Sequence, residues 1–329
     1  MATPVRLLRL LALHAVAWIF MIPVAPGADS GYPARHIRMI APFSAGSTLD
    51  ITARLVADQL GARLGHNVVV DNRAGANGVI GTDLVAKSAP DGHTLLFTTG
   101  SFTGNLLLVK NLPYDGTRDF SPVTQVARSY GLVLVVHPAV KAGSLKELIA
   151  LAKGHPGALK YGSGGVGNMT HLAGELFGAL AAVQLTHVPY KGSGPAMADV
   201  VGQQIEMSIV STVFVQPFIK AGRVRALALT GPERAPVLPD VPTFKELGFP
   251  EFEWTGWYGL WFPARTPQAR VNRIQSEIRN ALAAPDVKSR LDELGIVPVA
   301  STPAEFARFL KDDLALQARI VKMAGLQPQ

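Results

Sequence analysis

Two stretches of this chain have the residue types that can hold an anion without a charged side chain. In residues 38–50 (RMIAPFSAGSTLD) and residues 159–171 (LKYGSGGVGNMTH), a strand-like run leads through glycine and serine into a helix-like pattern. The first N–H groups of a helix have no partner inside the helix, and the helix dipole adds partial positive charge there. Each stretch therefore predicts an anion site. No convincing catalytic group accompanies either one, which favours binding of an anion over its conversion.

Other uses of the second stretch fit the residues less well. Gly162, Gly164 and Gly167 have the spacing of a dinucleotide-binding loop, but the next predicted strand ends in residues 189–192 (PYKG), without the acid that would bind a ribose hydroxyl. The esterase pattern Gly-x-Ser-x-Gly is absent because Tyr161 stands two positions before Ser163. No P-loop lysine follows a glycine loop. We expect no catalytic residues and no cofactor.

A metal site is not expected either. His171 and Glu175 are spaced i, i+4 and could face one ion, but two ligands without a third make a poor site. The sequence predicts instead a pair on a helix surface. The chain has no cysteine, which excludes thiol catalysis, cysteine-based metal sites and disulfides.

The first residues predict export. Arg6 and Arg9 precede an apolar run of residues 10–24, and small residues follow at Ala25, Gly27 and Ala28. This is the layout of a signal peptide, and the apolar run is shorter than the roughly 20 residues of a membrane span. We expect residues 1–28 to be removed and the protein to be periplasmic. Removal takes two positive charges from a net charge of +7 and leaves +5. The basic residues are scattered, so we expect no nucleic-acid binding.

Alternating strand and helix patterns must position the two loops, and they predict an α/β fold with mostly parallel or mixed sheets flanked by helices. Strand patterns cover residues 37–42, 67–71, 94–98, 132–137, 186–188, 205–210 and 225–230. Helix patterns cover residues 48–64, 80–88, 195–201 and 215–221, and another follows Thr266 and Pro267. Capping boxes at residues 144–147, 243–246 and 302–305 predict further helix starts. Ligands of such folds bind beyond the carboxyl ends of strands.

Short motifs along the whole chain resemble those of the Bug family, the extracytoplasmic solute receptors of tripartite tricarboxylate transporters. They occur in order at residues 32–33 (YP), 41–50 (APFSAGSTLD), 71–78 (DNRAGANG), 89–95 (APDGHTL), 112–115 (LPYD), 171–175 (HLAGE), 187–192 (HVPYKG) and 238–243 (LPDVPT).

The resemblance implies a two-lobed periplasmic binding protein fold, the Venus flytrap. Residues 29–128 plus 256–329 would form lobe 1 and residues 129–255 lobe 2, joined by crossing segments near residues 126–131 and 254–259. It also implies a monomeric receptor that captures a small carboxylate-bearing solute between the lobes and delivers it to membrane permease subunits. Two alternatives stay open: a sensor that signals its bound state, and an exported α/β hydrolase that uses Ser163 or His171.

The resemblance further implies that backbone amides and water from the cleft loops hold the carboxylate. The corresponding residues are Phe43, Ala45, Gly46, Ser47, Asp50, Asn77, Gly78, Thr99 and Ser101 in lobe 1, and Ser163, Gly165, Asn168, Thr170, His171, Tyr190 and Ser211 in lobe 2. Ser47 replaces a family glycine and Asn168 a family serine, and each adds a hydrogen-bonding side chain. From its position in the first helical turn, Asp50 could equally complement the helix dipole.

Overall fold

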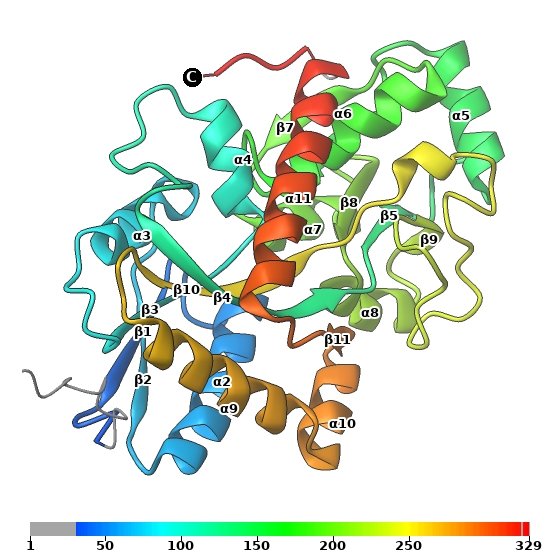
Figure 1. The fold of residues 1–329 in the computed structure, drawn as a ribbon. Coiled ribbons are helices and arrows are strands. Elements are labelled where there is room, and N and C mark those ends of the chain that lie inside the picture. Colours follow the sequence, from blue (N-terminus) through cyan, green and yellow to red (C-terminus); the bar gives the residue numbers. More distant parts are fainter. Residues whose placement is uncertain (1–30, 324, 329) are drawn as a thin grey trace, which may run out of the picture. The chain divides into compact units, whose positions relative to one another are not determined.

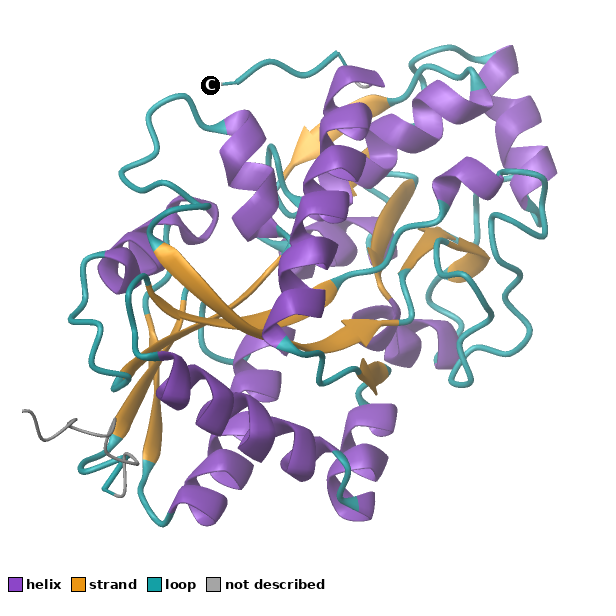
Figure 2. Cartoon of the chain, in the orientation of Figure 1, coloured by secondary structure: helices purple, strands orange, loops and turns teal. Residues whose placement is uncertain are grey.

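Two mixed β-sheets with helices packed on them form the part of the chain that the computed structural model describes, residues 31–323 and 325–328 (Figure 1). The predicted signal peptide lies outside these residues. Residues 33–329 cluster as one unit, within which strands and helices alternate along the chain (Figure 2). The α/β class predicted from the sequence is confirmed.

The first sheet combines strands from the two ends of the chain. Within the described residues it has six strands in the order β11-β4-β10-β3-β1-β2. The early strands β1 (Ile37–Ala41), β2 (Val68–Asn72) and β3 (Thr94–Thr99) are parallel, so their carboxyl ends meet at one edge. The late strand β10 (Trp257–Pro263) is antiparallel to both β3 and β4 (Phe120–Ser129), and β11 (Ile296–Pro298) closes the far edge.

The second sheet is built from the middle of the chain, in the order β7-β6-β8-β5-β9. Its strands are β5 (Leu132–Val136), β6 (Lys160–Ser163), β7 (Thr186–Pro189), β8 (Met207–Ser211) and β9 (Arg225–Leu229). The side chains of β5 show why this sheet is buried on both faces. Leu132, Leu134 and Val136 belong to one hydrophobic core and Val133 and Val135 to another, as the two-residue period of a strand requires.

Helices cover both sheets. Those beside the first sheet include α2 (Thr48–Leu64), the short η1 (Ala76–Gly78), α3 (Val79–Ala86), α4 (Ser101–Leu108), α9 (Gln268–Leu282) and α10 (Pro285–Glu293). Those beside the second are α5 (Leu145–Gly154), α6 (Met169–Ala181), α7 (Ser193–Val201), α8 (Thr212–Lys220) and the short η2 (Pro250–Phe252). The helix beginning at residue 243 is not formed: Thr243 and Glu246 make both capping-box hydrogen bonds, but they close only a turn.

The chain passes between the sheets twice, and the two crossings are hydrogen-bonded to each other. The Ser129 N–H donates to the Gly256 carbonyl at 2.7 Å, and the Gly256 N–H donates to Ser129 Oγ at 3.0 Å. Gly131, at φ +118°, lies so close to Gly231 that a Cβ on it would sit 2.6 Å from the Gly231 nitrogen. Only glycine fits such a backbone contact.

The last helix, α11 (Pro303–Met323), packs against elements of both sheets (Figure 1). Near its start, Phe306 joins the core of the first sheet beside Trp257 and Trp261. Near its end, Ile320 is buried in a core of the second sheet, which also holds Trp254. All three of these tryptophans are buried.

Candidate functional site

The first loop lies at the carboxyl end of β1 and leads into α2. Ser47 is the N-cap, and its hydroxyl accepts a hydrogen bond from the Asp50 N–H at 3.2 Å. Gly46 has φ +78°, a conformation that glycine adopts without strain. Its N–H donates to Asp50 Oδ2 at 2.9 Å, so the carboxylate and the loop backbone are fixed together.

The Asp50 carboxylate is fully occupied by the protein. Besides Gly46, it accepts from Asn72 Nδ2 at 3.0 Å and from Arg54 Nε at 3.1 Å. Burial opposes ionisation of this carboxyl, but the hydrogen bonds from Gly46, Arg54 and Asn72 outweigh that effect, so its pKa lies below the usual value. The geometry thus supports a bracing role for Asp50 within the loop.

Several backbone donors of this loop are unused. The N–H groups of Ala45, Thr48 and Leu49 have no acceptor among the described residues. Two of them belong to the first turn of a 17-residue helix, where the dipole favours negative charge. The first loop can therefore receive an anion through its backbone.

The other expected residues of the first sheet gather at the same edge. A Cβ on Gly78 would lie 3.4 Å from the ring of Phe43, so η1 packs directly on the first loop. Asn77, at φ 50°, exchanges hydrogen bonds of 3.0 Å with Asn105 of α4. At the start of α4, the hydroxyls of Thr99 and Ser101 lie 3.3 Å apart.

The second loop follows β6 and uses most of its own donors. The N–H of Gly164 donates to Thr170 Oγ1 at 2.7 Å, that of Gly165 to Ser163 Oγ at 3.1 Å, and that of Gly167 to His171 Nδ1 at 3.1 Å. Within the part of the chain that the structure describes, the N–H groups of Val166 and Met169 remain without an acceptor. The glycine loop is thus less open to an anion than its sequence indicates.

The cap of α6 is Asn168 and not Thr170. Asn168 Oδ1 accepts from the N–H and from the hydroxyl of Thr170, each at 3.0 Å. Because the Thr170 hydroxyl also accepts from Gly164, it joins the loop to the helix end. Both donors of Thr170 therefore have protein partners.

A cluster of polar rings, of which Tyr161 and His171 are buried and His187 is half-buried, lies against this loop. The rings of His171 and His187 are stacked with centroids 4.0 Å apart, and His187 Nε2 lies 2.6 Å from Ser163 Oγ. The Tyr161 hydroxyl donates to Glu175 Oε1 at 2.5 Å, and His171 Nε2 lies 3.8 Å from the same oxygen. The prediction of a surface pair was wrong for His171, which is 3% exposed. His187 is not among the expected site residues, although it begins the motif of residues 187–192.

Burial lowers the pKa of both imidazoles. For His187, burial and the neighbouring His171 outweigh the opposing effect of Glu175 and lower the pKa to about 4. For His171, burial alone lowers the pKa. Burial and Glu175 raise the pKa of the Tyr161 hydroxyl well above its usual range. Both rings are therefore neutral at neutral pH.

The last two expected residues border the second loop. The Tyr190 N–H donates to the Ser163 carbonyl at 3.1 Å, and its hydroxyl donates to Asp199 at 2.6 Å. Burial and Asp199 raise the pKa of Tyr190 to about 12. Ser211 is the N-cap residue of α8 at the end of β8, which runs parallel to β6. It shares an edge with Ser163, but no hydrogen bond joins these two residues.

A pocket of about 670 Å³ lies between the second loop and helices beside the first sheet; residues 325–328 also line it, and no residue of the first loop does. Asn77 and Asn105 line it from the first sheet, and Val166 and Gly167 from the second loop. Leu108 of α4 completes the contact, because a Cβ on Gly167 would lie 3.2 Å from Leu108 Cδ1. Among the described residues, no hydrogen bond joins the first loop to the second.

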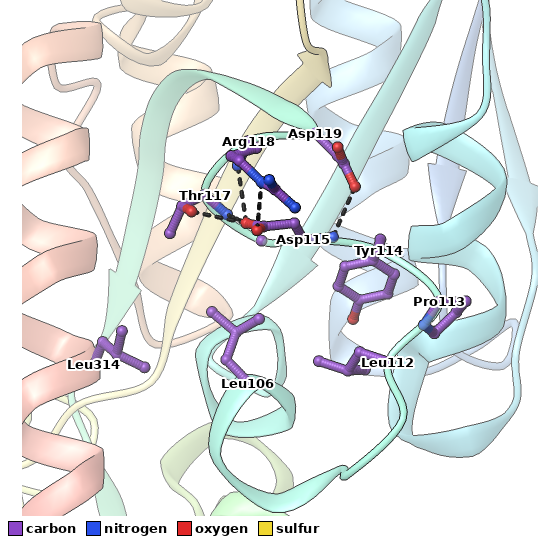
Figure 3. Close-up of a pocket in the computed structure, with 10 residues that line it drawn as sticks. Leu106, Leu112, Pro113, Tyr114, Asp115, Thr117, Arg118, Asp119 and Leu314 are labelled. Carbon is purple, nitrogen blue, oxygen red and sulfur yellow. Dashed lines mark hydrogen bonds and ion pairs between the residues drawn. The ribbon is translucent and has the colours of Figure 1, made fainter.

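A second pocket, of about 640 Å³, lies elsewhere and is lined by Leu106, residues 112–119 and Leu314 (Figure 3). Asp115 there accepts hydrogen bonds from the hydroxyl and N–H of Thr117 and from Arg118, which lower its pKa to about 2. None of the expected site residues lines this pocket. The residues that the structure describes contain no group of three metal-ligating side chains and no helix long and apolar enough to cross a membrane.

Comparisons with known proteins agree on one family. Residues 52–326 match the model of the tripartite tricarboxylate transporter family receptor. The chain is 38% identical to protein BugT of Bordetella pertussis, over 95% of this chain and 97% of that protein. Among solved structures, the periplasmic binding protein BugD is 32% identical with a TM-score of 0.82, over 91% of this chain and all of that one. An R. palustris protein solved with adipate is also 32% identical, with a TM-score of 0.84 over the same shares.

These similarities span both sheets and confirm the predicted periplasmic binding protein fold. The chain belongs to the tripartite tricarboxylate transporter receptor family, whose members are solute-binding receptors and not enzymes.

Proposed function

We propose that this protein is a periplasmic receptor that captures a small carboxylate-bearing solute between two lobes and delivers it to the membrane subunits of a tripartite transporter. The observation that carries the proposal is the row of unused N–H groups at Ala45, Thr48 and Leu49, at the start of α2. Backbone donors at a helix start suit a carboxylate. A similar receptor was solved with adipate, a dicarboxylate.

The proposed site consists of the loops expected from the sequence, but their residues have different roles. The N–H groups at the start of α2 would hold the carboxylate, together with Asn77, Thr99 and Ser101. The opposite wall of the cleft would come from loops of the second sheet, through the Val166 N–H, Tyr190 and Ser211. Asp50 would brace the first loop because its oxygens already accept three protein donors.

The lobes would be residues 29–128 plus 256–329 and residues 129–255. Each contains one whole sheet, apart from the last residue of β4, and the crossings lie at the proposed boundaries. We propose export through residues 1–28 and a monomeric receptor. A hydrolase that uses Ser163 does not suit this geometry, because the Ser163 side chain is completely buried and out of a substrate's reach.

A thermal-shift screen of mono- and dicarboxylates, including adipate and malate, tests the proposal, followed by calorimetry on the acids that stabilise the protein. The informative variant is Gly46→Val, which places a side chain beside the unused N–H groups. Gly65→Val is the matched control, because Gly65 also has positive φ, also has no atom within 4 Å of a built Cβ, and ends the same helix.

Both variants should lose similar stability, about 1–2 kcal/mol, from the left-handed backbone. Only Gly46→Val should lose affinity, by roughly ten- to a hundredfold for one lost hydrogen bond to a charged group. Equal affinities in the two variants would remove the first loop from the site. A screen in which no carboxylate stabilises the protein would contradict the proposed ligand class.

A further inference from the structure

The stacked rings of His171 and His187 lie against the second loop of the proposed site. His171 comes from α6 and His187 from β7, and the side chain of His171 is almost wholly buried. Neither ring makes an ion pair shorter than 3.8 Å among the described residues. Their polar contacts are instead with the loop and its first residue, Ser163.

The hydrogen bonds determine where the protons are. Since the Gly167 N–H donates to His171 Nδ1, this nitrogen carries no proton, and the proton of the neutral ring is on Nε2, toward Glu175. A second proton would have to go to Nδ1. It would then face the Gly167 N–H, and two donors cannot share a hydrogen bond.

His187 acts on the loop through Ser163. Its Nε2 lies 2.6 Å from Ser163 Oγ, which accepts the Gly165 N–H at 3.1 Å. The Ser163 hydroxyl donates to the Gly165 carbonyl at 3.3 Å, so its oxygen can accept from both the Gly165 N–H and His187 Nε2. Each imidazole therefore holds one glycine of the loop, directly in one case and through a hydroxyl in the other.

We infer that His171 and His187 are positioning residues that set which amides of the second loop are available, and that a proton on His171 Nδ1 releases the Gly167 amide. This inference rests on the proposed function, because it assigns the loop to the ligand site. The inferred role means that the second loop keeps its hydrogen bonds at neutral pH and loses the one at Gly167 in acid.

The surroundings of the pair give the direction and range of the effect. The titratable groups that face the rings are Tyr161 of β6 and Glu175 of α6, and the rings lie too close for both to be charged. Burial and His171 lower the pKa of His187 to about 4. An unfolded histidine titrates near pH 6.5, so between about pH 6.5 and 4 the unfolded chain binds more protons and stability falls as the pH falls.

Nuclear magnetic resonance of the protein without any added acid tests the inference independently of the ligand. From about pH 7.5 to about pH 4, the amide signals of Gly165 and Gly167 should shift together with those of the two imidazoles, and exchange of the Gly167 amide should quicken about tenfold beyond the chemical effect of pH.

Two substitutions separate positioning from packing. His171→Asn keeps an acceptor near the place of Nδ1 but cannot titrate, so the Gly167 amide should stay protected and lose its pH dependence. His171→Leu removes the acceptor, and the amide should exchange quickly at every pH. His137→Asn is the control, because His137 Nδ1 also accepts a backbone N–H, that of Ala139, outside this loop. It should leave Gly165 and Gly167 unchanged.

The inference is overturned if the imidazoles titrate while the two glycine amides stay still, or if His171→Asn keeps the pH response of Gly167. If His171→Leu does not fold, the titration of the wild type and of His171→Asn still tests the inference. A separate experiment measures adipate affinity across the same pH range, and it tests whether the second loop belongs to the proposed site. Amides that respond while adipate affinity stays constant would support the positioning role and remove the second loop from the proposed site.

Discussion

The hydroxyl of Thr170 has two protein partners, and this distinguishes a structural role from a ligand contact. Its removal in Thr170→Val leaves the half-buried Gly164 N–H without this acceptor, which should lower the free energy of unfolding by about 1 kcal/mol. Thr170→Ser keeps the hydroxyl and should restore most of this loss. Urea denaturation measures both. Unchanged stability of Thr170→Val with weakened carboxylate binding would instead make the hydroxyl a ligand donor.

At this scale the sequence predicts where the loops lie better than which donors they offer. The helix start at residue 48 follows from local residue types, because the Ser47 side chain caps α2. The donors left free depend on tertiary contacts. Asp50 takes the Gly46 N–H, and His171, stacked on a histidine from another strand, takes that of Gly167. The spacing of residues along the chain does not predict such tertiary contacts.

Among the elements, α11 fixes α4 through a buried acid. Asp313 Oδ2 accepts from Thr103 Oγ1 at 2.5 Å and from Gln317 Nε2 at 2.7 Å. Gln317 also donates to the Gly100 carbonyl, just before the first residue of α4. Burial raises the pKa of Asp313 above its usual value, although the hydrogen bonds from Thr103 and Gln317 oppose the rise.

Asp313→Asn should therefore change how stability depends on pH. Because the folded protein holds the proton of Asp313 more tightly than the unfolded chain, wild-type stability from this group falls as pH rises above about 4. The variant cannot ionise, so its free energy of unfolding relative to wild type should rise over that range. Urea denaturation at several pH values measures this difference. Asp312→Asn, at the exposed neighbouring position, is the control, and identical slopes in all three proteins would contradict the argument.

The elements that the sequence missed are those that tertiary contacts create. Helix α4 begins after Gly100, which provides no side-chain cap, and Gly104 lies within it. Glycine disfavours a helix, so contacts from Asp313 and Gln317 stabilise this one. Strand β11 has only three residues, too few to show a period. By contrast, α2 matches residues 48–64, because buried residues recur at helical spacing and Gly65 ends it.

For the whole molecule, the proposed lobes predict closure around a ligand. The crossings near residues 126–131 and 254–259 are the proposed hinge, and the closed state would bring the two loop groups together. A carboxylate that stabilises the protein should lower the radius of gyration in small-angle scattering. At an acid concentration that saturates only the wild type, Gly46→Val is the control, and its radius of gyration should not change. A constant wild-type radius at saturating acid would contradict hinge closure.

Strand β10 has a consequence for how the protein reaches this structure. In the first sheet it lies between β3 and β4, although the entire second sheet separates it from both along the chain. While the chain emerges from the ribosome, β3 and β4 have no partner for the edges that will face β10. A fragment that stops before residue 257 lacks both β10 and β11, so it exposes one edge of β3 and both edges of β4, which favour association with other chains. The first sheet begins early in synthesis and is completed late, so its folding depends on contacts distant in sequence and is intrinsically slow.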